Sequence, residues 1–189
     1  MMEQNTRTTL LDSAERAVRA RGYDGFSYAD LATAVGIRKA SIHHHFPTKG
    51  DLALALVQRY RTDFLERLAH IEARYDRAGD RLRAYVQLYR DALSQGEKTC
   101  LCVAFGVAPD SIPAPVGLEI RQFHTESLEW LETLFVLGRD DLSIESIGDP
   151  VREAAACLAQ MEGGQLVARS AKDVTLFDDA LSLLLARIR

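Results

Sequence analysis

Apolar residues recur at intervals of three and four along nearly the whole chain, which is the spacing of one face of an α-helix. The sequence has no convincing stretch in which β-branched and polar residues alternate with the period of a strand. The pattern therefore predicts an all-α fold. Glycines, prolines and polar clusters divide it into helices over residues 6–21, 27–35, 39–46, 51–75, 77–95, 100–107, 116–137, 150–170 and 173–188.

The composition is that of a globular protein, with 47% hydrophobic and 26% charged residues in a chain of 189. No stretch approaches the roughly 18 consecutive apolar residues of a membrane span, and the start MMEQNTRTTLLDSAERA lacks the apolar run of a signal peptide. We therefore expect a cytoplasmic protein that does not bind membranes. The odd number of cysteines, Cys100, Cys102 and Cys157, indicates free thiols.

Charge is distributed unevenly along the chain. The net charge of −4 excludes a uniformly basic coat for nucleic acid. Residues 1–50 nevertheless hold seven Lys and Arg against five Asp and Glu, whereas the remaining residues hold sixteen against twenty-two. The first 50 residues are therefore the part that can attract a polyanion, and they also contain the run His43, His44 and His45.

Two short helices joined by the tight turn Val35-Gly36-Ile37 form the pattern of a helix-turn-helix, whose second helix lies in the DNA major groove. The first helix opens with Ser27 and Asp30 in the spacing of a capping box, and the glycine ends it. On the second helix, Ile42 and Phe46 lie four apart and face inward. The outward face then comprises Ala40, Ser41, His43 and His44, with Lys39 and His45 at its edges. Such side chains can reach base edges and phosphates.

Three other functions are possible for a chain with these residues: metal binding, a role without DNA and catalysis. Consecutive histidines point about 100° apart on a helix and cannot converge on one metal ion, and a site at Cys100, Cys102 and Cys157 lacks further ligands nearby. The segment could also be a helical hairpin that does not bind DNA. A small-molecule-modifying helical enzyme is the remaining alternative, but the sequence has no P-loop, nucleophile elbow or zinc motif. We therefore expect a protein that is not an enzyme and needs no cofactor.

The segment FSYADLATAVGIRKASIHHHFPTKGDL resembles the N-terminal signature of the TetR family of transcriptional regulators. The match includes Gly36, the Ile42 and Phe46 pair, and Lys49, which opens the next helix. The resemblance implies a homodimer that binds a palindromic double-stranded DNA operator, usually as a repressor released by a small-molecule inducer. By position in the family motif, the residues expected at the DNA are Ser27, Arg38, Lys39, Ala40, Ser41, His43, His44, His45 and Lys49.

Two positions depart from the family pattern, because Ala40 stands where glycine is frequent and His43 where tyrosine is usual. The resemblance therefore does not specify the operator sequence. We expect a DNA-binding domain over residues 1–50, with the motif at about 27–46, and a ligand-binding and dimerisation domain over residues 51–189.

The last two expected helices are the natural dimerisation pair. Their apolar stripes comprise Ala154, Ala155, Leu158, Met161, Gly164 and Leu166, followed by Leu176, Phe177, Leu181, Leu184 and Leu185. Two adjacent glycines, Gly163 and Gly164, cost helix stability and suggest a close approach of two backbones. A contact within the same chain is the alternative.

A candidate ligand pocket is lined by residues whose apolar bodies carry polar tips: Tyr85, Tyr89, Cys100, Phe105, Phe123, His124 and Trp130. Each of them could equally be ordinary core. Cys100 would open a helix two residues after Lys98, and a helix dipole and a nearby cation both favour a nucleophilic thiolate. The stretch GEKTCLCVAFGVAPDSIP resembles the NemR-like and AcuR-like branches of the family, with Thr99 in place of a glycine. The alternatives for this cysteine are an electrophile or redox sensor and a buried, inert thiol.

Overall fold

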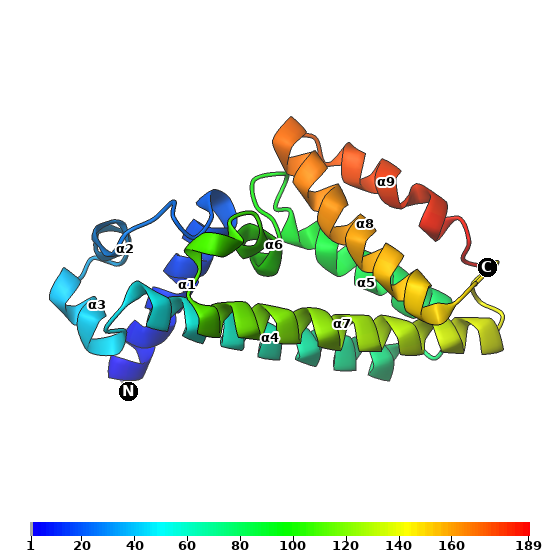
Figure 1. Cartoon of the computed structure of the whole chain (residues 1–189), viewed down its shortest axis with the longest axis horizontal. Helices are drawn as coiled ribbons and strands as arrows, with labels where there is room; N and C mark the ends of the chain where they lie inside the picture. Colours follow the sequence, from blue (N-terminus) through cyan, green and yellow to red (C-terminus); the bar gives the residue numbers. More distant parts are fainter. Residues whose placement is uncertain (1) are drawn as a thin grey trace. The chain divides into compact units, whose positions relative to one another are not determined.

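The computed structural model describes residues 2–189, with side chains from residue 6 onward, and its regular elements in this range are helices joined by short loops (Figure 1). The helices are α1 (Met2–Arg21), α2 (Tyr28–Val35), α3 (Lys39–His45), α4 (Lys49–Arg74), α5 (Ala78–Ala92), α6 (Leu101–Gly106), the 3-10 helix η1 (Pro109–Ser111), α7 (Ala114–Asp140), α8 (Pro150–Ala171) and α9 (Thr175–Leu185). One isolated bridge pairs Ile144 with Ile188. The all-α prediction is confirmed. Among the described residues, no helix has the length and apolar content needed to span a membrane.

Every expected helix is present, and the differences lie at the ends. Helix α4 begins at Lys49 rather than at residue 51, because Thr48 and Asp51 cap it reciprocally: the Thr48 hydroxyl donates to Asp51 Oδ2 at 2.8 Å and the Asp51 amide donates back at 3.1 Å. Helix α5 ends at Ala92 instead of residue 95, and Ser94 and Gln95 follow with positive φ angles. Helix ends depend on such local bonds more than on apolar spacing.

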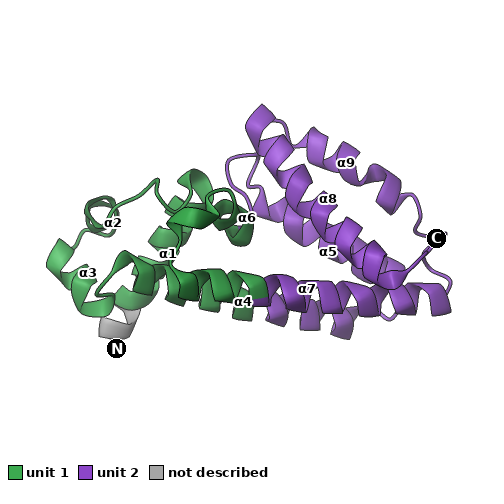
Figure 2. Ribbon diagram, viewed as in Figure 1, with its two compact units in different colours: residues 1–62, 101–121 green, residues 63–100, 122–189 purple. Residues whose placement is uncertain are grey.

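The chain divides into two compact units (Figure 2). Unit 1 contains residues 1–62 and 101–121, and unit 2 contains residues 63–100 and 122–189. The division falls inside α4 and α7, so the units do not follow the order of the chain. These units are defined by packing and not by function. The expected division into a DNA-binding domain over residues 1–50 and a ligand-binding domain over residues 51–189 therefore stays a prediction.

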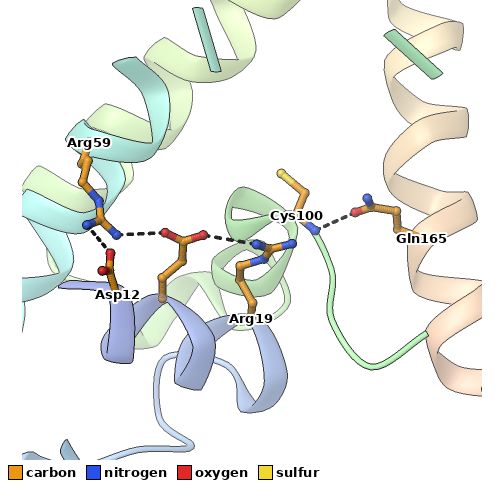
Figure 3. Close-up of polar contacts among 6 residues, drawn as sticks. Asp12, Arg19, Arg59, Cys100 and Gln165 are labelled. Atoms are coloured by element: carbon orange, nitrogen blue, oxygen red, sulfur yellow. Dashed lines mark hydrogen bonds and ion pairs between the residues drawn. The ribbon is translucent and has the colours of Figure 1, made fainter. Parts of the chain in front are cut away.

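Unit 1 is built around α1. Leu10, Ala14 and Val18 repeat along one face of this helix and are fully buried, as the sequence spacing predicts. Gly22 ends the helix in the left-handed region at φ +77, a conformation that costs glycine little. On the polar side, Arg59 of α4 donates to Asp12 Oδ1 at 2.7 Å and to Glu15 Oε2 at 3.0 Å, while Glu15 also pairs with Arg19 (Figure 3). This network joins α4 to α1.

Unit 2 contains α5, α8, α9 and the second parts of α4 and α7. Helices α8 and α9 pack closely, because a Cβ on Gly164 would lie 3.1 Å from Phe177 Cδ2. The close approach expected at this glycine is therefore a contact within the chain. At Gly163 a Cβ would meet nothing within 4 Å. Cys100, Cys102 and Cys157 are free, as predicted, and all three are buried.

Arg187 holds the C-terminal segment of unit 2 in place. Its guanidinium donates to both carboxylate oxygens of Glu153 on α8, each at 2.9 Å, and to the carbonyl oxygens of Glu145 and Ser146, each at 3.1 Å. The hydrogen bonds from Arg187 lower the pKa of the Glu153 carboxyl. The ionised form of Glu153 is therefore favoured in the folded chain.

We expect Arg187→Gln to lower the free energy of unfolding by about 1–3 kcal/mol at pH 7, since it removes a fork of charge-assisted hydrogen bonds. A carboxyl with a lowered folded-state pKa contributes stability above its ordinary pKa, and that contribution is lost as pH falls through the folded-state value. The difference between wild type and variant, measured by urea unfolding, should thus shrink below about pH 4. Arg152→Gln is the matched control, because its side chain is 88% exposed. A difference that stays constant from pH 7 to pH 3 would contradict the role given to Glu153.

Candidate DNA interface and ligand cluster

Helices α2 and α3 form a helix-turn-helix within unit 1. Ser27 is the N-cap of α2: its amide and hydroxyl donate to Asp30 Oδ2 at 2.7 and 2.8 Å, and the Asp30 amide donates back to Ser27 Oγ at 3.3 Å. Gly36 ends α2 in the left-handed region at φ +75. The predicted capping box and glycine turn are therefore confirmed.

Tyr28, the first residue of α2, fixes the C-terminal end of α3. Its hydroxyl lies 2.9 Å from the carbonyl oxygen of Phe46 and 2.6 Å from that of Thr48, so it donates to the turn between α3 and α4. Burial and the nearby charge of Asp51 raise the pKa of Tyr28 to about 12. The hydroxyl therefore remains a donor at neutral pH and keeps the orientation of α3 fixed relative to α2.

Helix α3 separates an apolar side from a polar side as the spacing predicts. Ile42 is fully buried and Phe46 is 2% exposed. The exposed residues at or next to this helix are Arg38, Lys39, Ala40, Ser41, His43 and His44, while His45 is half-buried. Because the sequence of α3 contains no carboxylate, this face carries no negative side chain. A short helix with a fixed inner side and a carboxylate-free outer side suits a polyanionic groove.

His43 is exposed but already oriented by the protein. Its Nδ1 lies 3.0 Å from the carbonyl oxygen of Pro47, and its ring lies 4.9 Å from the ring of Tyr28. A carbonyl oxygen only accepts, so Nδ1 carries the hydrogen. Nε2 then accepts when the ring is neutral and donates when it is protonated.

Two of the residues expected at the DNA are engaged inside unit 1. The Lys49 ammonium lies 4.5 Å from the ring centroids of both Tyr23 and Phe26, and burial lowers its pKa. The Ser27 hydroxyl donates a hydrogen bond to the Asp30 carboxylate. The capping-box spacing predicts the Ser27–Asp30 pair, whereas nothing in the sequence motif indicates the contact of Lys49 with the two rings. A phosphate contact from either side chain would have to compete with these partners.

Unit 2 gathers most of the expected ligand residues into an aromatic cluster. The Phe64 ring lies 4.8 Å from Phe123 and 6.2 Å from both Tyr85 and Tyr89, and Trp130 stacks on Tyr85 at 5.2 Å. The Tyr85 hydroxyl donates to that of Tyr89 at 3.4 Å, and burial raises the pKa of both well above the ordinary value. Both tyrosines are therefore neutral hydroxyls.

Polar partners surround this cluster. His124 Nε2 lies 3.1 Å from Glu162 Oε1, and this hydrogen bond raises the pKa of His124 despite partial burial. Gln165 is fully buried, and Cys100 N donates to its Oε1 at 2.7 Å (Figure 3). The Gln165 Nε2 in turn donates to the carbonyl oxygen of Tyr89 at 2.6 Å. The segment that ends at Cys100 is thus tied to α5 through a side chain of α8.

The aromatic cluster differs in membership from the expected set of ligand residues. Phe105 belongs to unit 1, where its ring contacts Tyr23 at 5.7 Å, so its place in a ligand site stays a prediction. Phe64, Glu162 and Gln165 were not expected at the site from the sequence. A polar residue on the apolar stripe of α8, between Met161 and Ala168, was the signal for Gln165. No group of three or more His, Cys, Asp or Glu side chains suited to a metal ion occurs in the described part of the chain.

Comparison with known proteins agrees with this geometry. The model of bacterial regulatory proteins of the tetR family matches residues 10–56. A crystal structure of a TetR-family transcriptional regulator from Agrobacterium tumefaciens is 30% identical, with a TM-score of 0.93 over 98% of both chains. The chain belongs to the TetR family. It is therefore a DNA-binding transcriptional regulator and not an enzyme, as the sequence predicts.

Other relatives of this TetR-family regulator are more distant. The transcriptional repressor NemR of Escherichia coli is 23% identical over 186 residues, which cover 95% of this chain and 92% of NemR. The crystal structure of NemR in its reduced form has a TM-score of 0.85 at 22% identity, over 98% of this chain and 97% of that one. The regulator TtgR of Pseudomonas putida is 30% identical over 90 residues, 47% of this chain and 43% of TtgR. The similarity to NemR extends over most of both chains. It agrees with the resemblance of the Cys100 stretch to the NemR-like branch of the family.

Proposed function

We propose that this regulator is a cytoplasmic homodimeric repressor that binds a palindromic operator through α3 and is released by a small molecule. The observation that carries the proposal is the exposed, carboxylate-free face of α3, fixed from behind by Ile42, Phe46 and the Tyr28 hydroxyl. In this proposal residues 1–50 bind DNA, and residues 51–189 bind the ligand and dimerise. The protein would act in the cytoplasm, because the DNA that carries its operator lies there.

The residues at the DNA fall into two groups. Arg38, Lys39 and Ala40 lie at the start of α3 and would be nearest the base edges together with His43, since the first residues of a recognition helix enter the groove. Ser41, His43, His44 and His45 on the same helix would add phosphate contacts. Ser27 and Lys49 would contribute less, because Asp30 and two aromatic rings already hold them.

Dimerisation through α8 and α9 is supported by the apolar residues that these helices leave exposed. Val151, Leu166, Val167 and Leu183 are 56%, 40%, 53% and 79% exposed. Small residues line the same exposed side of α8: Ala155, Ala156, Ala159 and the half-buried Gly163. Small side chains allow two helices to approach closely, and burial of the larger apolar ones would favour association. The partner in this proposal is a second copy of the chain.

The aromatic cluster of unit 2 is the proposed ligand site, with Tyr85, Tyr89, Phe123, His124 and Trp130 as its central residues. Trp130 Nε1 is buried and has no hydrogen-bond acceptor among the described residues. A buried donor without an acceptor is costly, so an organic ligand that supplies an oxygen acceptor and an apolar body would be stabilised here. Release from DNA requires that this ligand bind the DNA-incompetent arrangement more tightly.

A thiol sensor at Cys100 is the second candidate mechanism. The Cys100 side chain is 2% exposed, which favours an inert thiol. The Cys100 thiol lies close enough to His124 to influence the pKa of that ring, and a protonated His124 would in turn stabilise a thiolate. Sensing would then proceed by addition of the thiolate sulfur across the double bond of an electrophile, with water supplying a proton to the second carbon.

One experiment tests both mechanisms. A fluorescent duplex selected from a random pool is titrated with reduced protein, the anisotropy is recorded at several salt concentrations, and the titration is repeated after treatment with N-ethylmaleimide. Selection of a palindrome and a steep salt dependence support the operator proposal. If alkylation releases the wild type but not a Cys100→Ser variant, the sensor is supported. If the alkylated protein stays on DNA, the thiol-sensor mechanism is overturned and release by a reversible ligand remains as the proposed mechanism. Failure to select any sequence would overturn the operator proposal.

A further inference from the structure

An open groove runs between the second part of α4 and helix α5 in unit 2, separate from the residues proposed to bind DNA, ligand or a second copy. Its volume is about 590 Å³, within the range of roughly 300–1,000 Å³ typical of small-molecule sites. Arg67 and Ile71 line it from α4, Arg83 and Leu88 line it from α5, and Tyr75 lies in the turn that joins the two helices. The groove therefore combines apolar and cationic side chains.

Three arginines at this groove lack carboxylate partners. Arg59, Arg90 and Arg187 elsewhere in the chain are each paired with Asp or Glu at 3.0 Å or less. In contrast, no ion pair involves Arg67, Arg74 or Arg83 within the described residues 2–189, although Arg83 Nη2 lies 3.5 Å from the carbonyl oxygen of Ile188. Unpaired guanidinium groups on two neighbouring helices are suited to a carboxylate, which they can bind through parallel hydrogen bonds.

The turn between α4 and α5, beside the groove, is held in place by its own contacts. Arg81 Nε donates to the carbonyl oxygen of Tyr75 at 2.8 Å, which fixes the turn between the helices. The Arg74 guanidinium lies 5.4 Å from the centroid of the Tyr75 ring. Ile71 is 7% exposed and Leu88 is half-buried, so both offer an apolar floor. Cations therefore stand beside apolar surface in a preorganised turn.

Two carboxylates limit which anions fit. Asp91 at one end accepts from the Gln87 amide at 2.6 Å, and Asp80 lies in the first turn of α5. Both would repel a polyanion such as nucleic acid, whereas a single negative charge can be placed beside the arginines. We propose that this groove binds a small amphipathic monocarboxylate, whose carboxylate pairs with the arginines and whose apolar body covers Ile71 and Leu88.

The test uses octanoate as the probe and octanamide as its uncharged match, with the full-length protein. Binding is followed through the Nε–Hε cross-peaks of the arginines in a two-dimensional NMR titration. We expect octanoate to shift the Arg67, Arg74 and Arg83 signals in the wild type, and the Arg74 signal, which the double variant retains, measures affinity in both proteins. The double variant Arg67→Gln/Arg83→Gln, which removes one cation from each helix, should weaken octanoate binding at least about tenfold, because charge-assisted hydrogen bonds are lost.

The same titration is carried out on a control variant and with two other probes, and some of its results would overturn the proposed carboxylate site. Arg152→Gln changes an exposed arginine of α8 and should leave octanoate affinity unchanged. Equal affinity of octanoate for the wild type and the double variant would overturn the site. Equal binding of octanamide would overturn the pairing with a carboxylate, and equal binding of inorganic phosphate would overturn the role of the apolar floor. Since all three arginine side chains are exposed, thermal unfolding of the double variant should match the wild type.

Discussion

The double variant Arg38→Gln/Lys39→Gln should bind the selected operator about 100-fold more weakly than the wild type at moderate salt. Both side chains are exposed at the start of α3, and neither supports the interior of unit 1. Each lost base contact costs about 1–3 kcal/mol, and each lost phosphate contact lowers the slope of log affinity against log salt by about 0.9. The measurement is fluorescence anisotropy with the selected duplex at four salt concentrations.

The salt slope distinguishes this explanation from simple misfolding. A folded variant keeps the thermal unfolding curve of the wild type while both its affinity and its salt slope fall. Arg139→Gln removes an exposed cation at the end of α7 and should leave operator binding unchanged. Lys49→Gln should have a smaller effect than the double variant, because the ammonium of Lys49 lies against two rings. Wild-type affinity in the double variant would show that α3 does not read the operator.

Replacing Gln165 with leucine should lower the free energy of unfolding by about 2–5 kcal/mol. Leucine fills a similar space but neither accepts from the Cys100 amide nor donates to the carbonyl oxygen of Tyr89. Each buried backbone group that loses its partner costs about 1–3 kcal/mol. Thermal unfolding at fixed protein concentration measures the loss, which corresponds to a shift of about 5–15 °C for a protein of this size.

A matched substitution and a second variant make this test specific. Gln160→Leu introduces the same change at an exposed position of α8 and should alter stability by less than about 0.5 kcal/mol. Gln165→Glu should also destabilise, since a carboxylate can still accept from Cys100 but cannot donate to Tyr89. If Gln165→Leu unfolds at the wild-type temperature, the side chain does not hold α5, α8 and the segment ending at Cys100 together.

The helix-turn-helix was predictable because its signals are local. Ser27 with Asp30 and the glycine at position 36 specify where α2 begins and ends, and the spacing of Ile42 and Phe46 specifies the inner side of α3. All of these relations span at most a few residues, within which apolar spacing and caps decide the structure. The DNA contacts themselves remain predictions.

Contacts between distant segments were not predictable in the same way. The Lys49 ammonium meets Tyr23 and Phe26 only after α1 and α4 have packed, and Gln165 meets Cys100 across 65 positions of the chain. Apolar spacing identified α8 but could not name the partners of its buried amide. The membership of α6 in unit 1 was unpredictable for the same reason. This helix joins the N-terminal helices through tertiary packing, which the apolar spacing within a single helix does not encode.

The separation of the two sides of α3 makes operator recognition easy to re-target by design. Side chains at Lys39, Ala40 and Ser41 are exposed, so replacing them leaves the interior of unit 1 undisturbed. Ile42 is fully buried, and the His43 ring is bound to the Pro47 carbonyl oxygen beside Tyr28. A library that varies the first three positions and keeps the next two would therefore sample new operators without loss of folded protein. Related genes could acquire new targets by the same few changes.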